Sequence, residues 1–313
     1  MSERIPSAMI EKSEHSAQTL MLIDGHAQAY RSFFAIRELK SRTGQPANAV
    51  FGFFKSLISL MAQHRPSHLA VIWDGGLDAK RVALHPAYKA QRPPMPESLD
   101  SQIDAIAEGL RSGHFATWMQ EGVEADDWIS KAAVNFAEQH GHVLISSSDK
   151  DFMQLVSDRV HLIKPGQEAG STFGPAEVLA KTGVQPQQIV DWLSLMGDSV
   201  DGIPGVPSVG PKTASDLLRK YGTLQEILNQ TGTLMPERLR HAIVSHASSL
   251  GRNQELIALR TEIPVPVDFK ACDLGQFCPV SWRGFCAQWG FNSLARGFDT
   301  LSNEREQPEL CLT

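Results

Sequence analysis

The sequence predicts an α/β fold in which helices flank a central, mostly parallel sheet, followed by a smaller C-terminal helical subdomain. Three observations carry this prediction. Short runs of consecutive apolar residues alternate with amphipathic stretches, which is typical of parallel strands buried on both faces. Three of these runs lead into acidic residues. The last third of the chain contains instead short helical patterns joined by segments rich in Gly and Pro.

The length and composition set the domain organisation. A chain of 313 residues with 42% hydrophobic side chains can bury a sizeable core and exceeds the size of one small domain. We therefore expect one large domain with a smaller one appended. The predicted segments are a disordered tail over 1–18, an α/β core over 19–185, a helical region over 186–302 and a second tail over 303–313.

Composition narrows the class of protein. No apolar run approaches the roughly 20 residues that cross a bilayer, and the polar N-terminus lacks the apolar core of a signal peptide. The four cysteines are scattered without CxxC spacing, which argues against zinc and favours reduced thiols in a cytoplasmic protein. A net charge of −6 would argue against a nucleic-acid partner, but without the nine acids singled out below the remainder is positive.

Two predicted strands of the core end in an acid. The apolar run over 19–23 leads into Asp24, and the run over 69–73 leads into Asp74. An amphipathic helix over 48–63 lies between them. The other predicted elements are a helix after Asp24, strands over 143–145 and 160–163, and helices after 124, over 175–181, over 186–196 and, as the last one, over 282–289.

Acids recur at equivalent places along the chain. Glu124, Asp126 and Asp127 fall in the first turn of a helix, where acids can simply complement the helix dipole for about 0.3 to 1 kcal/mol each. Asp149 and Asp151, however, follow the strand over 143–145 in the same way that the acids above follow theirs. Ligands of open parallel sheets bind beyond the carboxyl ends of the strands. We therefore expect these acids to face one spot.

Two more acids, Asp198 and Asp201, lie where the helix over 186–196 ends, and they bring the set to nine. If even half of the set converges, cations must offset the repulsion, and ligands that are all oxygen select Mg²⁺ or Mn²⁺. Two such ions are suited to phosphodiester hydrolysis, with direct attack by water, since these segments hold no His or Cys nucleophile. A structural calcium site is the alternative, although no EF-hand spacing occurs.

A long basic segment over 78–94 separates the second strand from the next regular element. It is broken by prolines and rich in Lys and Arg, unlike a packed core segment. Loops of this length are usually functional or disordered. A plain solvated connection is the alternative.

The segment over 205–214 has a different chemistry. A turn rich in Gly and Pro leads into a helix with Pro211 at its start and Lys212 beside it, which makes a phosphate-binding helix N-terminus. This has the look of a helix-hairpin-helix, which grips the backbone of duplex DNA without reading its sequence. An ordinary helix start is the alternative.

As a set, these motifs resemble the 5' nuclease domain of bacterial DNA polymerase I, within the flap endonuclease superfamily, from about residue 19 to 298. The resemblance implies a PIN-like 5' nuclease fold with a C-terminal helix-hairpin-helix subdomain. The motifs that carry it, apart from the hairpin, are Ile23-Asp24-Gly25-His26 with Ala29-Tyr30-Arg31, Trp73-Asp74, Tyr88-Lys89-Ala90-Gln91-Arg92, Glu124-Ala125-Asp126-Asp127, Ser148-Asp149-Lys150-Asp151 and Gly197-Asp198-Ser199-Val200-Asp201.

The resemblance implies a role for each site residue. The basic segment resembles a helical arch at about 78–97 through which a 5' end or flap passes, with Lys89 and Arg92 on the scissile phosphate and Arg31 nearby. The hairpin is implied to hold duplex DNA and a potassium ion. The implied first-metal ligands are Asp24, Asp74, Glu124 and Asp126 with Asp127 beside them, the second-metal ligands are Asp149, Asp151, Asp198 and Asp201 with Asp126 as a bridge, and the DNA contacts are Arg81, Tyr88, Gly205, Gly210, Lys212 and Thr213.

The sequence departs from the family pattern at two positions and in its length. Gly202 stands where the family often has Asn, next to Asp201. Ser208 stands where a hairpin Gly is usual and fits less well if that position needs a positive φ. The chain also stops where a polymerase I would continue, as expected of a stand-alone nuclease or a fragment.

The resemblance therefore implies a structure-selective 5'-3' exonuclease and flap endonuclease that removes primers and flaps in DNA replication and repair. The expected partners are DNA with 5' flaps, nicks or ends, and RNA primers paired to DNA, bound by a monomer without a membrane. Two alternatives stay open. One is a PIN-type ribonuclease, which would need neither hairpin nor arch, and the other is a branched-DNA binding module without catalysis.

Overall fold

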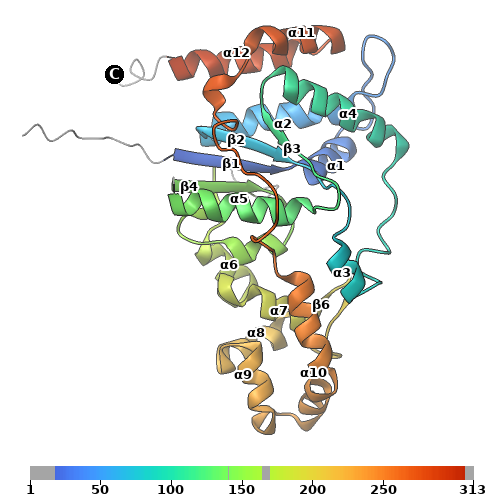
Figure 1. Ribbon diagram of the computed structural model, residues 1–313, viewed down its shortest axis with the longest axis vertical. Coiled ribbons are helices and arrows are strands. Elements are labelled where there is room, and N and C mark those ends of the chain that lie inside the picture. Colours follow the sequence, from blue (N-terminus) through green and yellow to red (C-terminus); the bar gives the residue numbers. More distant parts are fainter. Residues whose placement is uncertain (1–17, 140, 164–169, 307–313) are drawn as a thin grey trace, which may run out of the picture.

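The computed structural model describes residues 18–139, 141–163 and 170–306. A central sheet carries helices on both faces, and a helical extension projects from one side of it (Figure 1). The predicted tails cover 1–18 and 303–313. Residues 1–17 and 307–313, with Cys311, lie outside the described residues, whereas Gln18 begins a strand and residues 303–306 belong to a helix. The other three cysteines are free thiols. No helix in the described ranges is both long and apolar enough to span a bilayer.

The main sheet has five strands in the order β3-β2-β1-β4-β5, and every neighbouring pair is parallel. This confirms the predicted parallel sheet, with the strand that carries Asp24 at its centre. In register, Leu22 pairs with Ala70 on one side and with Ile145 on the other. The strands are β1 (Gln18–Asp24), β2 (His68–Ile72), β3 (Ala116–Trp118), β4 (Gly141–Ser146) and β5 (Val160–Ile163).

Alternate residues of the central strand serve two separate cores, because successive side chains of a strand point to opposite faces. Leu20 and Leu22 pack in the same core as Phe136 of α5 (Ala125–Gln139). Met21 and Ile23 pack in the other core, beneath α1, α2 and α4. The helices of that second layer are α1 (Gly25–Ala35), α2 (Asn48–His64) and α4 (Glu97–Ser112).

The helical extension follows the last strand and lies below the sheet in Figure 1. Its apolar residues join the α5 side of the core without a break. The two-stranded ribbon β6 (Gly197–Asp198) and β7 (Ile203–Pro204) forms the turn that carries Asp198 and Asp201. Its helices are α6 (Pro175–Thr182), α7 (Ile189–Met196), α8 (Pro211–Tyr221), α9 (Leu224–Asn229) and α10 (Glu237–Ile257), with 3₁₀ turns η2 (Pro186–Gln188) and η3 (Thr231–Thr233). A further 3₁₀ turn, η1 (Asp151–Leu155), lies between β4 and β5 in the core.

The C-terminal helices differ from the expectation. The sequence predicts one last helix over 282–289, whereas the structure has α11 (Pro279–Trp289), preceded by the 3₁₀ turn η4 (Leu274–Gln276), and then α12 (Asn292–Glu306). Both helices return to the α2 face of the sheet, opposite the helical extension (Figure 1). The Trp282 ring packs edge-to-face against Phe54 of α2, with ring centroids 4.8 Å apart. The segment after 279 therefore completes the core.

The arch predicted over about 78–97 is helical only in α3 (Ala79–Leu84). Asp78 caps this helix by accepting a hydrogen bond from the Arg81 amide at 2.9 Å. Prolines at 86, 93, 94 and 96 then prevent a continuous helix, since proline lacks the amide donor. Consecutive turns connect α3 to the next helix instead. That helix is α4, which was not among the predicted elements and begins at Glu97.

Candidate active site

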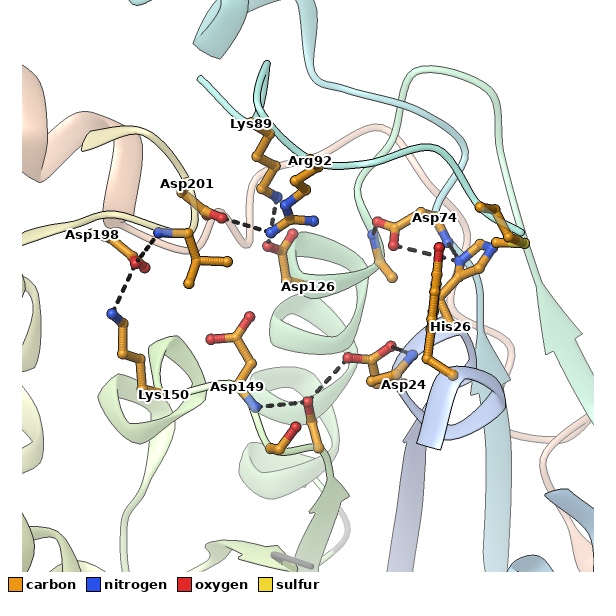
Figure 2. Close-up of a pocket in the computed structure, with 17 residues that line it drawn as sticks. Asp24, His26, Asp74, Lys89, Arg92, Asp126, Asp149, Lys150, Asp198 and Asp201 are labelled. Carbon is orange, nitrogen blue, oxygen red and sulfur yellow. Dashed lines mark hydrogen bonds and ion pairs between the residues drawn. The ribbon is translucent and has the colours of Figure 1, made fainter. Parts of the chain in front are cut away.

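Six acids from segments far apart in the sequence converge around a cavity of about 690 Å³ (Figure 2). The cavity lies at the carboxyl ends of the strands, as the parallel sheet requires. The structure therefore brings together six of the nine candidate metal ligands in one place. The acids that line the cavity are Asp24, Asp74, Asp126, Asp149, Asp198 and Asp201.

Ser147 connects the acids of the two central strands. Asp24 caps α1 by accepting from the Ala27 amide at 3.0 Å, and its second oxygen accepts from the Ser147 hydroxyl at 3.0 Å. The same hydroxyl oxygen accepts from the Asp149 amide at 3.1 Å. The ends of β1 and β4 are thus held at a fixed separation, with both carboxylates facing the cavity (Figure 2).

Asp74 is fixed by two neighbours. Its carboxylate accepts from the Ala125 amide at 2.9 Å, and its own amide donates to Nδ1 of His26 at 3.1 Å. The His26 ring stands edge-on to Trp73 at 5.3 Å. Burial alone would raise the pKa of Asp74, but the His26 ring, whose Nδ1 lies 3.5 Å from the carboxylate, and the hydrogen bond from the Ala125 amide hold that pKa below its ordinary value. This carboxylate is therefore ionised at neutral pH.

Asp151, Asp198 and Asp201 form the tightest cluster of acids. Each offers an oxygen within 4.8 Å of the others, and all three residues are buried. Burial, followed by repulsion from Asp149 and Asp201, raises the pKa of Asp151 well above its ordinary value. One oxygen of Asp151 is buried without a hydrogen-bond partner among the described residues. A cluster of oxygen donors with an unpartnered buried oxygen fits a hard cation such as Mg²⁺ or Mn²⁺.

The remaining cavity acids also favour a cation. Burial, reinforced by repulsion from Asp74 and Asp149, raises the pKa of Asp24 to about 6. Burial, reinforced by repulsion from Glu124 and Asp127, raises the pKa of Asp126 to about 7. Both acids are thus costly to ionise in the metal-free protein.

This electrostatic arrangement predicts a pH-dependent stability. A carboxyl whose pKa is raised by folding favours the folded state while protonated, so that this contribution disappears as the pH rises through about 6 to 7 for Asp24 and Asp126. In EDTA we expect the melting temperature to fall between pH 5.5 and pH 8. Saturating Mn²⁺ should raise it at pH 8 by about 5 °C and make it less dependent on pH. A metal-free melting temperature that rises over this range would contradict the prediction.

Cations from the arch enter the same cavity. Lys89 contacts the carboxylate of Glu124 and lies 3.7 Å from that of Asp126. Arg92 pairs with Asp201 at 2.6 Å. Figure 2 shows both side chains reaching from the arch toward the acids. Both residues line the cavity together with the acids.

Lys150 is a third cavity cation, and the sequence analysis assigned it no role. Its ammonium group pairs with Asp198 at 2.9 Å (Figure 2). Its position between Asp149 and Asp151, two predicted metal ligands, was the sequence feature that could have indicated a place in the site. This pair connects the loop after β4 to the β6–β7 turn.

Glu124 does not line the cavity, although it contacts Lys89, which does. It is fully buried and accepts hydrogen bonds from the Tyr88 hydroxyl at 2.9 Å and the Asp78 amide at 3.0 Å. Lys89 is its third donor. Its predicted role as a metal ligand therefore remains a prediction, whereas its structural role in anchoring the arch is evident. Tyr88, a predicted DNA contact, is buried with it.

Asp127 belongs to a second buried network. It accepts two hydrogen bonds from the guanidinium of Arg81, at 2.9 and 2.8 Å, and one from the Arg260 amide at 2.8 Å. Arg81 is only 3% exposed, although the sequence predicts it as a DNA contact. Arg260 also pairs with Asp78 at 2.8 Å. This network connects the base of the arch to α5 and to the end of α10. No sequence motif predicted that Arg260 would take part in it.

Arg31, predicted to lie near the scissile phosphate, is on α1 but does not line the cavity. Burial lowers the pKa of its guanidinium, and the charge of Asp24 opposes this shift. One of its terminal nitrogens is buried and lacks a hydrogen-bond partner within the described part of the chain. Its guanidinium is therefore close enough to Asp24 to be affected by its charge and has one donor without a partner.

The predicted hairpin lies between α7 and α8. A Cβ atom at Gly205 would lie 2.0 Å from the Met196 backbone, so this glycine is required by close packing of the chain. Gly210, the N-cap of α8, faces open space instead. Lys212 is exposed and Thr213 half-buried in the first turn of that helix. Gly210 and Lys212 are thus accessible to a phosphate group.

Ser208 has a φ of +67°, so the position does require the left-handed region. A residue with a Cβ is disfavoured there by roughly 1 kcal/mol or more. Replacing Ser208 with Gly is therefore expected to stabilise the protein by about 0.5 kcal/mol, after allowing for the greater chain entropy of glycine. Urea unfolding measures this. Ser199→Gly is the matched control, and equal stability changes in both variants would contradict the assignment of strain to position 208.

Comparison with known families gives two matches that together cover most of the chain. Residues 19–183 match the 5'-3' exonuclease N-terminal resolvase-like domain, and residues 184–279 match the 5'-3' exonuclease C-terminal SAM fold. A 5'-3' exonuclease of Aquifex aeolicus is 38% identical over 248 residues, which are 79% of this chain and 84% of that protein. DNA polymerase I of Rhizobium leguminosarum is 35% identical over 92% of this chain, but over only 29% of the polymerase.

Solved structures agree on the fold. The bacteriophage T5 D15 flap endonuclease, in a complex with DNA and metal ions, is similar with a TM-score of 0.64 at 22% identity, covering 93% of this chain and all of that one. The catalytic core of Rad2 in complex with a DNA substrate has a TM-score of 0.58 at 14% identity, covering 91% and 92% of the two chains. At these identities the similarity concerns the fold alone.

Proposed function

Because this chain belongs to the 5'-3' exonuclease family, we propose that it is a structure-selective nuclease that cuts DNA near 5' ends, nicks and flaps with two Mg²⁺ or Mn²⁺ ions. The observation that carries the proposal is the cavity itself, in which six carboxylates face a lysine and an arginine from a separate segment. Carboxylates that suit divalent cations and basic side chains that suit a phosphate line the same cavity. A purely structural calcium site would not need the basic side chains Lys89 and Arg92.

The acids form two groups of metal ligands. Asp24, Asp74 and Asp126 would hold one ion. The second group would hold the other ion, and its members are Asp149, Asp151, Asp198 and Asp201. Bound divalent ions neutralise charge that develops on the phosphate and favour attack by water, without a covalent intermediate.

Lys89 and Arg92 would bind the oxygens of the scissile phosphate once DNA displaces their present acidic partners. Arg31 has a free donor for a neighbouring phosphate. The accessible N-terminus of α8, with Gly210 and Lys212, would bind the backbone of the duplex, with a potassium ion. The cut is thereby placed at a fixed distance from the duplex.

The wider setting follows from the same proposal. Relatives named DNA polymerase I support a role in primer and flap removal during replication and repair. We include RNA primers paired to DNA among the substrates. We also propose that the protein acts as a monomer in the cytoplasm, with access to DNA.

The deciding experiment is cleavage of end-labelled 5'-flap, nicked-duplex and single-stranded DNA, with Mg²⁺ or EDTA, beside Asp74→Asn. We expect metal-dependent cutting near the junction that is lost in the variant. Tight flap binding without cutting would favour a DNA-binding module. Preferential cutting of single-stranded RNA would favour a PIN-type ribonuclease instead.

A further inference from the structure

The arch and the turn that carries Asp201 touch through their backbones. The Lys89 amide donates to the Asp201 carbonyl oxygen at 2.9 Å. Nε2 of His85 lies 2.9 Å from the Gly202 carbonyl oxygen, and since a carbonyl only accepts, Nε2 is the donor. Arg92 adds its ion pair with Asp201. Three contacts of different kinds thus join residues 85–92 to two consecutive residues of the β6–β7 turn.

Gly202 is required by this contact. Its φ is +71°, and a Cβ atom there would lie 2.6 Å from the carbonyl oxygen of Ala87. That oxygen belongs to the backbone of the arch, so it could not yield without moving the segment. A residue with a side chain at this position would therefore have to displace the arch.

The backbone of Lys89 is strained in the same place. Its φ is +53°, in the left-handed region that residues with a Cβ seldom adopt. Strain of this kind persists only where the surroundings hold it. Here the surroundings are the hydrogen bond to Asp201 and the contact of the ammonium group with Glu124. Releasing the turn would allow Lys89 to relax and leave the cavity.

We propose that His85 and Gly202 are positioning residues that latch residues 85–92 onto the β6–β7 turn, so that Lys89 and Arg92 lie over the acids before DNA binds. The inference rests on the proposed function for its purpose, although the latch itself is a property of the free protein. It acts through the two basic side chains. Neither His85 nor Gly202 lines the cavity.

Amide hydrogen exchange of the free, full-length protein tests the latch. Gly202→Ala should accelerate exchange of the Lys89 amide about tenfold or more, as loss of a hydrogen bond and its support would. Gly222→Ala is the matched control, because Gly222 has a φ of +85° and nothing within 4 Å of its Cβ position. It shares the backbone strain without the contact. Equal exchange rates in the two variants would overturn the latch.

His85 gives a second variant that leaves the turn's own sequence intact. His85→Phe keeps a ring but removes the donor, and we expect it also to accelerate exchange at Lys89. His85→Gln retains a donor and should restore part of the protection. If Phe and Gln have the same effect as each other, the hydrogen bond to Gly202 contributes nothing and the assignment of His85 fails.

A second experiment compares the rate of cleavage with the affinity of the protein for Mn²⁺. In single-turnover cutting of a 5' flap, Gly202→Ala and His85→Phe should reduce the rate about tenfold, while Mn²⁺ affinity, measured by electron paramagnetic resonance, stays at the wild-type value. Faster exchange with an unchanged rate would overturn the positioning role, and weaker Mn²⁺ binding would assign the effect to Asp201. If the wild-type protein cuts nothing, the proposed function fails, while exchange still decides the latch.

Discussion

Replacing Asp149 with Asn is expected to abolish cleavage while leaving the protein at least as stable as the wild type. Asp149 lines the cavity, and its oxygen accepts a hydrogen bond from the Asp151 amide at 2.9 Å. An asparagine can accept the same bond, so the loop keeps its conformation. It cannot supply the negative charge that a divalent cation needs. Loss of one such group from a preorganised charged site costs about 10³-fold in rate.

The expected stability of Asp149→Asn follows from the repulsion between Asp149 and the neighbouring carboxylates. Burial raises the pKa of Asp149, and the charges of Asp201 and Asp198 raise it further. Ionising this residue in the metal-free protein is therefore unfavourable, and Asn removes the cost. We expect the melting temperature in EDTA at pH 8 to be equal or higher, while stabilisation by Mn²⁺ decreases. This combination separates a lost ligand from a damaged fold.

The control is an acid on the same domain outside the cavity. Asp158 is exposed in the turn before β5, so Asp158→Asn should alter neither cleavage nor the response to Mn²⁺. Cleavage by Asp149→Asn within tenfold of the wild-type rate would remove Asp149 from the proposed catalytic set. Equal losses in both variants would point to a general effect of lowering the negative charge.

Several site residues could be located from sequence because a parallel sheet leaves little freedom at its carboxyl edge. Asp24 is the last residue of the buried strand β1, and Asp74 comes shortly after β2, so their place was fixed once the strands were identified. Asp149 comes shortly after β4 in a similar manner. Asp198 and Asp201 were included because they lie where the helix over 186–196 ends, although no strand of the main sheet leads into them.

The orientation of the acids within one helical turn could not be deduced in this way. Glu124, Asp126 and Asp127 are close in sequence, yet only Asp126 faces the cavity. The other two are held by Lys89 and Arg81, which approach from the arch. The arch has few apolar residues and many prolines, so no periodicity reveals its path. Charge pairing between distant segments decides the result, and local pattern contains no information about it.

Asp127→Ala is expected to destabilise the protein by about 3 to 5 kcal/mol, the cost of leaving a buried charge without its partner. Arg81 is 3% exposed, and among the described residues its guanidinium would then keep only the Ala258 carbonyl at 3.0 Å and a longer contact with Glu124 at 3.4 Å. Urea unfolding in EDTA measures the loss. Asp216→Ala is the matched control, because Asp216 pairs with Arg219 at 2.9 Å on the surface, and it should cost about 0.5 kcal/mol or less.

A double-mutant cycle distinguishes the ion pair from simple loss of packing. Arg81→Met replaces the guanidinium with an apolar side chain, and in combination with Asp127→Leu it removes both charges at once. Since buried pairs can be exchanged for apolar residues at little cost, the double variant should be more stable than either single variant. Costs that simply add would mean that the two residues stabilise the arch independently. The predicted coupling would instead show that Arg81 and Asp127 hold the base of the arch to α5 as a pair, which helps to fix where the chain bearing Lys89 begins.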